Sequence, residues 1–285
     1  MLTAWTFPVP FSLVTIAVAI CYLRGWWRLR PVAVDAIPAW RAASFLVGVF
    51  LIWLAIGSPL ALLDEQLLTV HMVQHLLLMT IAPALILMGA SVMPILHGLP
   101  QRLVQSVLGP FLRWPLAQAI GRMLSQPAFC WLTAAAALIG WHIPALFQLA
   151  MRSDWLHVVE HSSFLAAGFL FWWPVIQPWP SVPVWPRWSI LLYLFAATLP
   201  CDILSAYLTF CDRVVYPAYL NAQDLFGISP LDDQECAGAL MWACVTLIFL
   251  VPAARITLQL LGPNTKAREL GEVGMGTVSS ESSRT

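Results

Sequence analysis

Charged residues are scarce in this sequence. Asp, Glu, Lys and Arg make up 10% of the 285 residues, while apolar residues make up 60%. An ordinary soluble domain carries about a quarter charged residues, so this composition excludes a soluble fold and is typical of a polytopic membrane protein. The formal net charge is zero, and we expect no nucleic-acid partner from such a balance.

Closely spaced cysteines are also missing. The six cysteines stand at positions 21, 130, 201, 211, 236 and 244, without a CxxC pair. We therefore do not expect a zinc site built from cysteine thiolates. Cys211 and Cys236 flank one outer loop and are candidates for a disulfide in an oxidising compartment, a pairing that the sequence leaves open.

No polar stretch separates the apolar segments widely enough to form a soluble domain. At about 20 apolar residues per membrane-spanning helix, about seven spans fit. They cover residues 6–23, 42–61, 68–90, 128–149, 156–176, 188–210 and 237–258. We predict an all-α polytopic fold with one membrane domain at 1–262, followed by a tail at 263–285 whose Gly, Ser and charged residues favour disorder.

Basic residues indicate the orientation of the chain. Lys and Arg total 14, and with the N-terminus outside only Arg152 and Arg213 of them fall on the outer side. Because cytoplasmic loops carry the excess of Lys and Arg, we predict an outer N-terminus and a cytoplasmic C-terminus. The inner loop at 91–127 is rich in proline and arginine, and we expect one or two short helices lying on the lipid surface there.

Two histidine pairs have helical spacing. His71 and His75 open the third predicted span, and His157 and His161 open the fifth. An i,i+4 spacing stacks the members of each pair on one helix face. His142, near the outer end of the fourth span, lies at a similar depth. Each imidazole needs a partner in an apolar medium, and a shared metal ion or haem satisfies several at once.

A single histidine of this kind is more often a hydrogen-bonded structural side chain, and only the gathering of five favours a common metal or haem site. His97 lies in the inner loop and is left out. Imidazole suits zinc, copper and iron alike. Met72 and Met79 flank the first pair, and ordinary packing is the simpler interpretation of both.

Three carboxylates are candidates for supporting roles around the histidines. Glu160 and Asp233 are candidate acceptors for the N–H groups of metal-binding imidazoles. Asp233 is alternatively a solvated acid ahead of the last span. Asp202, in the outer half of the sixth span, is either a structural group or a member of the same polar cluster.

Five segments between residues 71 and 242 resemble the polytopic CtaG family of cytochrome c oxidase assembly factors. They read HMVQHLLLMTIAPALILMGA, WHIPALFQLA, HVVEHSSFLAAGFLFWWPV, YLTFCDRVVYPAY and DDQECAGALMW. The resemblance implies a bacterial plasma-membrane protein of about seven spans that is needed for an active haem-copper oxidase. It further implies a role in copper insertion or in assembly of the catalytic subunit, oxidase subunits as partners, and no catalysis of its own.

The family's histidine pattern maps onto the five histidines already singled out, and its last motif maps onto Asp233, Gln234, Met241 and Trp242. Together with the topology, this leads to the hypothesis of an outer-leaflet copper site. Its metal-binding residues are His71, His75, His142, His157 and His161. The sequence does not fix the ion, its oxidation state or the oligomeric state.

Other functions remain open at this stage. HVVEH has the HxxEH form of zinc hydrolases, in which the Glu is the general base, and Glu235 is then a possible third ligand. Histidines on facing helices also suit a b-type haem. A scaffold for the oxidase subunit, with structural histidines only, is the remaining alternative.

Overall fold

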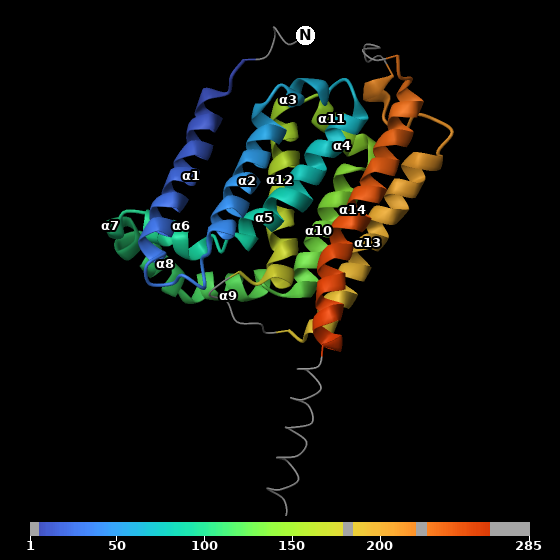
Figure 1. The fold of residues 1–285 in the computed structure, drawn as a ribbon. Helices are drawn as coiled ribbons and strands as arrows, with labels where there is room; N and C mark the ends of the chain where they lie inside the picture. The colour runs from blue at the N-terminus through green and yellow to red at the C-terminus, as the bar shows by residue number, and fades with distance from the viewer. Residues whose placement is uncertain (1–5, 179–184, 221–226, 263–285) are drawn as a thin grey trace, which may run out of the picture.

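The computed structural model describes residues 6–178, 185–220 and 227–262, and all regular structure in these ranges is helical (Figure 1). The predicted tail at 263–285 lies outside the described residues. The long helices are α1 (Val9–Leu29), α2 (Ala39–Gly57), α10 (Pro127–Trp141), α12 (Asp154–Ile176), α13 (Arg187–Phe210) and α14 (Pro230–Leu261). The shorter elements are α3 (Leu60–Leu63), α6 (Val92–Gly98), α7 (Gln101–Leu103), α8 (Gly109–Arg113), α9 (Pro115–Leu124), α11 (Pro144–Met151) and the 3₁₀ turn Pro217–Tyr219.

One continuous helical rod, Leu68–Met88, forms the centre of the bundle. It consists of α4 (Leu68–Leu76), a π-helical turn (Leu77–Ile81) and α5 (Ala82–Met88). Of its most apolar stretch 61% is buried, against 28% or less in the other four candidate spans. Helices α2, α12 and α14 pack against it. The rod is therefore enclosed by protein, whereas the outer helices keep apolar faces exposed.

The chain is a multi-pass membrane protein. Five described helices are long and apolar enough to cross a membrane: α1, α2, the rod, α13 and α14. The pair α9 and α10, bent by 69°, makes a sixth if it is counted as one span. The predicted number of seven is thus not confirmed. Helix α12 has 23 residues, but acids and histidines in its first two turns lower its hydropathy.

The predicted span at 128–149 is wrong as a single helix. Helix α10 ends at Trp141, Ile143 is extended with ψ 122°, and α11 begins at Pro144. Proline disfavours helical geometry in the residue before it, so the helix is interrupted at Ile143. The break leaves His142 at the C-terminal end of α10.

The loop at 91–127 is more helical than predicted. Instead of one or two short helices it forms four, α6 to α9, with a π-helical turn, Val104–Leu108, between α7 and α8. These helices lie at the end of the bundle opposite α3, α11 and the start of α4 (Figure 1). His97 is exposed and belongs to α6, so it lies at the opposite end of the bundle from the other histidines.

Candidate metal centre

Four of the predicted histidines meet where α4 faces α12. The rings of His71 and His75 lie 4.2 Å apart between centroids, and those of His157 and His161 lie 4.3 Å apart. Across the helix interface, His71 is 5.7 Å from His157 and His75 is 5.6 Å from His161. The two i,i+4 pairs therefore face each other.

Burial differs systematically across the cluster. His71 is completely buried, and His75 and His161 are nearly so. The side chain of His157 is 21% exposed. The cluster thus has an open side at His157 and a closed side at His75.

Glu160 is the acid at the centre of the cluster. It is completely buried, and its Oε1 lies 3.7 Å from Nε2 of His71 and 3.5 Å from Nε2 of His75. Metal–imidazole bonds measure about 2.0–2.1 Å, so neighbouring donors around one tetrahedral ion are roughly 3.4 Å apart. The two measured distances are close to that value, and one donor atom from each of the three residues lies within 4.8 Å of the others.

Asp64 completes a second group of donors, which the sequence analysis did not identify. Its Oδ2 lies 3.6 Å from Nε2 of His157, and both side chains group with His71. Asp64 is 1% exposed. Burial, and next the repulsion from Glu65, raise the pKa of this carboxyl to about 7.

The cluster contains an unusual concentration of buried polar atoms without hydrogen-bond partners among the described residues. They are both ring nitrogens of His71 and His75, Nε2 of His157 and His161, and both carboxylate oxygens of Asp64 and Glu160. Buried polar groups are normally satisfied, and each one left unpaired costs about 1–3 kcal/mol. A neutral imidazole has a lone pair on one of its two nitrogens. Bound cations would satisfy these lone pairs and those of the carboxylates together, so the donor set fits a metal site.

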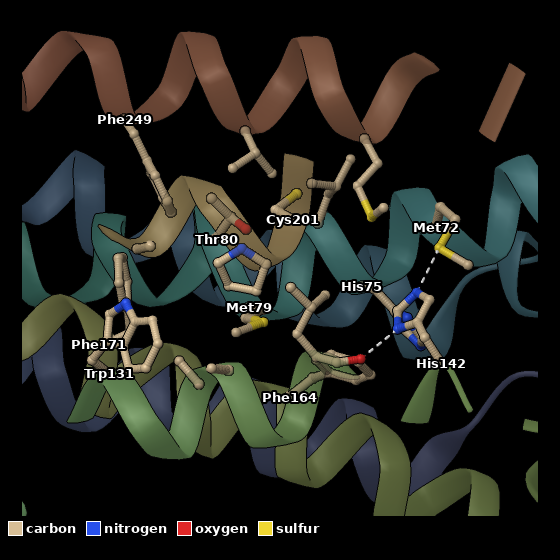
Figure 2. A pocket seen from close by; sticks show the side chains of 18 of the residues that line it. Met72, His75, Met79, Thr80, Trp131, His142, Phe164, Phe171, Cys201 and Phe249 are labelled. Atoms are coloured by element: carbon tan, nitrogen blue, oxygen red, sulfur yellow. Dashed lines mark hydrogen bonds between the residues drawn. The ribbon is translucent and has the colours of Figure 1, made fainter. Parts of the chain in front are cut away.

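His142 and His161 lie beside the two donor groups but belong to neither. The ring of His142 is 6.0 Å from that of His75. Its Nδ1 is 2.7 Å from the carbonyl oxygen of Leu138, and its Nε2 is 3.3 Å from Sδ of Met72. His142 therefore points into the adjoining cavity shown in Figure 2.

Asp233 positions the rod. Its two carboxylate oxygens accept hydrogen bonds from the backbone N–H groups of Leu68 and Thr69, at 2.6 and 3.1 Å. These are orphan donors at the start of a helix. Asp233 therefore caps α4 from α14. The sequence had suggested either an acceptor for imidazole N–H groups or a solvated acid, but the carboxylate is buried, and its hydrogen bonds among the described residues go to the start of α4. Asp202, half-buried on α13, is in neither donor group.

Residues of the last two motifs hold the loop after α13 over the cluster. Tyr219 donates its hydroxyl to the backbone oxygen of Asp64, and Tyr216 donates to that of His142. Gln234 accepts from the N–H of Val215 at 2.7 Å. Cys211 and Cys236 are both free thiols. The loop is therefore held by these hydrogen bonds and not by a disulfide.

Comparison with known proteins gives a consistent assignment. A family model described as cytochrome c oxidase caa3 assembly factor matches residues 20–262. Proteins described as uncharacterized from Mycobacterium leprae, Mycobacterium bovis and Mycobacterium tuberculosis are 23%, 26% and 26% identical over 90% of the chain. The chain spans 39% of the length of these relatives. No solved structure matches the chain significantly.

Proposed function

The chain belongs to the cytochrome c oxidase caa3 assembly factor family. We propose that it holds copper in its histidine cluster during maturation of a haem-copper oxidase. The copper is the cargo, to be delivered to the catalytic subunit of the oxidase. The observation that carries this proposal is the set formed by His71, His75 and Glu160, whose unpaired donor atoms are spaced for one ion.

The two donor groups suggest a direction of movement. His71 belongs to both groups, one with Asp64 and the half-open His157, the other with the buried His75 and Glu160. An ion that enters at His157 exchanges ligands through His71 without ever losing all of them. Imidazole and carboxylate donors accept copper among the first-row metals, and each step keeps the charged ion coordinated inside the apolar bundle.

The proposed site lies near the outer face of the bacterial plasma membrane. The start of α4, together with α3 and α11, lies at the same end of the bundle as the N-terminus of α1 (Figure 1). The excess of Lys and Arg at the opposite end supports a cytoplasmic location for that end. The partners are then oxidase subunits within the membrane, and the lipid that surrounds the exposed apolar faces.

A zinc hydrolase is not favoured by this geometry. In HxxEH enzymes the two histidines bind zinc and the glutamate acts on the substrate, whereas Glu160 here faces His71 and His75 of another helix. Glu235, the candidate third ligand, is exposed on α14. The geometry favours two donor groups that share His71 over a hydrolytic zinc site.

The test combines His75→Ala with Glu160→Gln. Copper in the protein purified in mild detergent, measured by elemental analysis, should fall about tenfold or more, because two ligands of the buried group are removed. In cells that depend on this oxidase, its activity should fall in parallel. A visible spectrum of the wild-type sample, recorded first, separates copper from haem.

His97→Ala is the matched control, because His97 is exposed on α6 and, among the described residues, its ring pairs with the Met93 carbonyl one turn away. It should leave both copper content and oxidase activity unchanged. Normal oxidase assembly in the His75/Glu160 double variant would contradict the proposed function.

A further inference from the structure

A cavity of about 60 Å³ adjoins the cluster on its closed side and is lined by sulfur. Met72, Met79, Cys201 and Met241 border it together with His75 and His142, and the remaining lining is mostly apolar and aromatic (Figure 2). The lining contains no Asp or Glu among the described residues. This volume exceeds the roughly 10–15 Å³ that one water molecule needs, so an ion fits.

The hydrogen bond of His142 fixes its tautomer. A carbonyl oxygen only accepts, so the 2.7 Å contact with Leu138 requires the proton on Nδ1. In a neutral imidazole the other nitrogen then carries a lone pair. A charged imidazolium is disfavoured here, because no carboxylate of the described residues pairs with His142, which is 5% exposed.

The lone pair of Nε2 points at an atom that has no hydrogen to donate. The thioether sulfur of Met72 lies 3.3 Å away and is completely buried. Two hydrogen-bond acceptors at this distance form no hydrogen bond with each other. Metal bonds of about 2.0 Å to nitrogen and about 2.3 Å to sulfur put two donors of one tetrahedral ion roughly 3.5 Å apart, which is close to the observed separation.

We infer that this cavity binds Cu(I), held by Nε2 of His142 and Sδ of Met72, with a further sulfur donor from the lining. The inference rests on the proposed function and gives it a chemical form, because it names the reduced ion as the species stored next to the cluster. Thioether and thiol donors select Cu(I). The charge of a monovalent ion also costs less to bury than that of a divalent ion, since the ion-transfer energy grows with the square of the charge.

The two sites suit different ions because their donor atoms differ. The cluster offers carboxylates and imidazoles and suits a divalent ion, while the cavity offers neutral sulfur and one imidazole and suits a soft monovalent ion. His75 borders both. The two sites are therefore adjacent and share one side chain.

The experiment is an anaerobic competition between the full chain in detergent and a coloured Cu(I) chelator. Wild-type protein should take Cu(I) from the chelator, and Met72→Leu, which keeps the side-chain volume, should weaken binding about tenfold or more. X-ray absorption at the copper edge should show sulfur neighbours in the wild type and a weaker sulfur signal in Met72→Leu, which removes one of the two sulfur donors. Met93→Leu, at a partly buried methionine in another core cluster, should match the wild type.

The results separate the inference from the proposed function. Unchanged Cu(I) affinity in both Met72→Leu and His142→Gln, with melting temperatures like the wild type, would overturn the cavity site even if Glu160→Gln abolishes oxidase assembly. Weaker Cu(I) binding in Met72→Leu supports the site, and it does so whether or not the oxidase still assembles. Unimpaired assembly in the His75/Glu160 double variant would count against the proposed function alone.

Discussion

At the scale of the residue, the position of α4 depends on one carboxylate that is distant in the sequence, that of Asp233. Asp233 accepts from Leu68 and Thr69, and the hydroxyl of Thr69 donates back to the backbone oxygen of Asp233. These bonds join the first turns of α4 and α14. His71 stands one turn beyond them, so its place in the cluster follows from this cap.

We expect Asp233→Ala to lower the free energy of unfolding by about 0.5–2 kcal/mol, the usual cost of losing a helix cap. Copper affinity should fall as well, because the first turn of α4 loses its anchor. Thermal unfolding and elemental analysis of the purified variant measure the two effects. Glu235→Ala, which removes an exposed acid two residues away, should do neither, and equal losses in both variants would refute the capping role.

The residue scale also shows how far the sequence predicts the site. Helical spacing sufficed to pair His71 with His75 and His157 with His161, because each pair lies within one helix. Asp64 could not be predicted from helical spacing, because it lies between α3, which ends at Leu63, and α4, which begins at Leu68. No helical period therefore connects it to His71. The metal-binding role of the histidines stays a prediction.

At the scale of the element, the cluster requires α12 to approach the rod closely. Gly168 of α12 makes this possible, because a Cβ there would lie 2.4 Å from the backbone oxygen of Met79. Met79 belongs to the π-helical turn of the rod. π-Helical turns of this kind are frequent at functional sites, and this one begins two residues after His75.

Gly168→Ala should therefore push α12 away from the rod and separate His157, Glu160 and His161 from His71 and His75. We expect a loss of stability of about 1–3 kcal/mol, typical of overpacking, together with weaker copper binding. Thermal unfolding and metal analysis measure both.

Gly140→Ala in α10 is the matched control, because nothing lies within 4 Å of the Cβ it would add. It should be neutral or stabilise the protein by about 0.5–1 kcal/mol, the gain of replacing glycine within a helix. A Gly168→Ala variant that behaves like Gly140→Ala would show that α12 does not need this close approach.

At the scale of the whole molecule, α12 is long enough to span the membrane but is not among the five helices with the highest apolar character. It has 23 residues, which at 1.5 Å per residue is about 34 Å, enough for the hydrocarbon core of about 30 Å. Its polar residues Glu160 and His161 are buried against the rod. Sequence hydropathy averages over both faces of a helix, so it cannot tell an inward-facing acid from one that faces lipid.

Whether α12 crosses the membrane can be tested, because an odd or even number of crossings decides whether the two ends of the chain lie on opposite sides or on the same side. Crossings by α12 and by the bent pair α9 and α10, added to the five apolar helices, give an odd number and place the two ends of the chain on opposite sides of the membrane. An alkaline phosphatase fusion at the N-terminus should then be active, while the same fusion at the C-terminus should be inactive and a fluorescent protein there should fluoresce. Fusions that report the same side for both ends would mean that one of these helices does not cross, and the cluster would then lie beside the membrane core instead of within it.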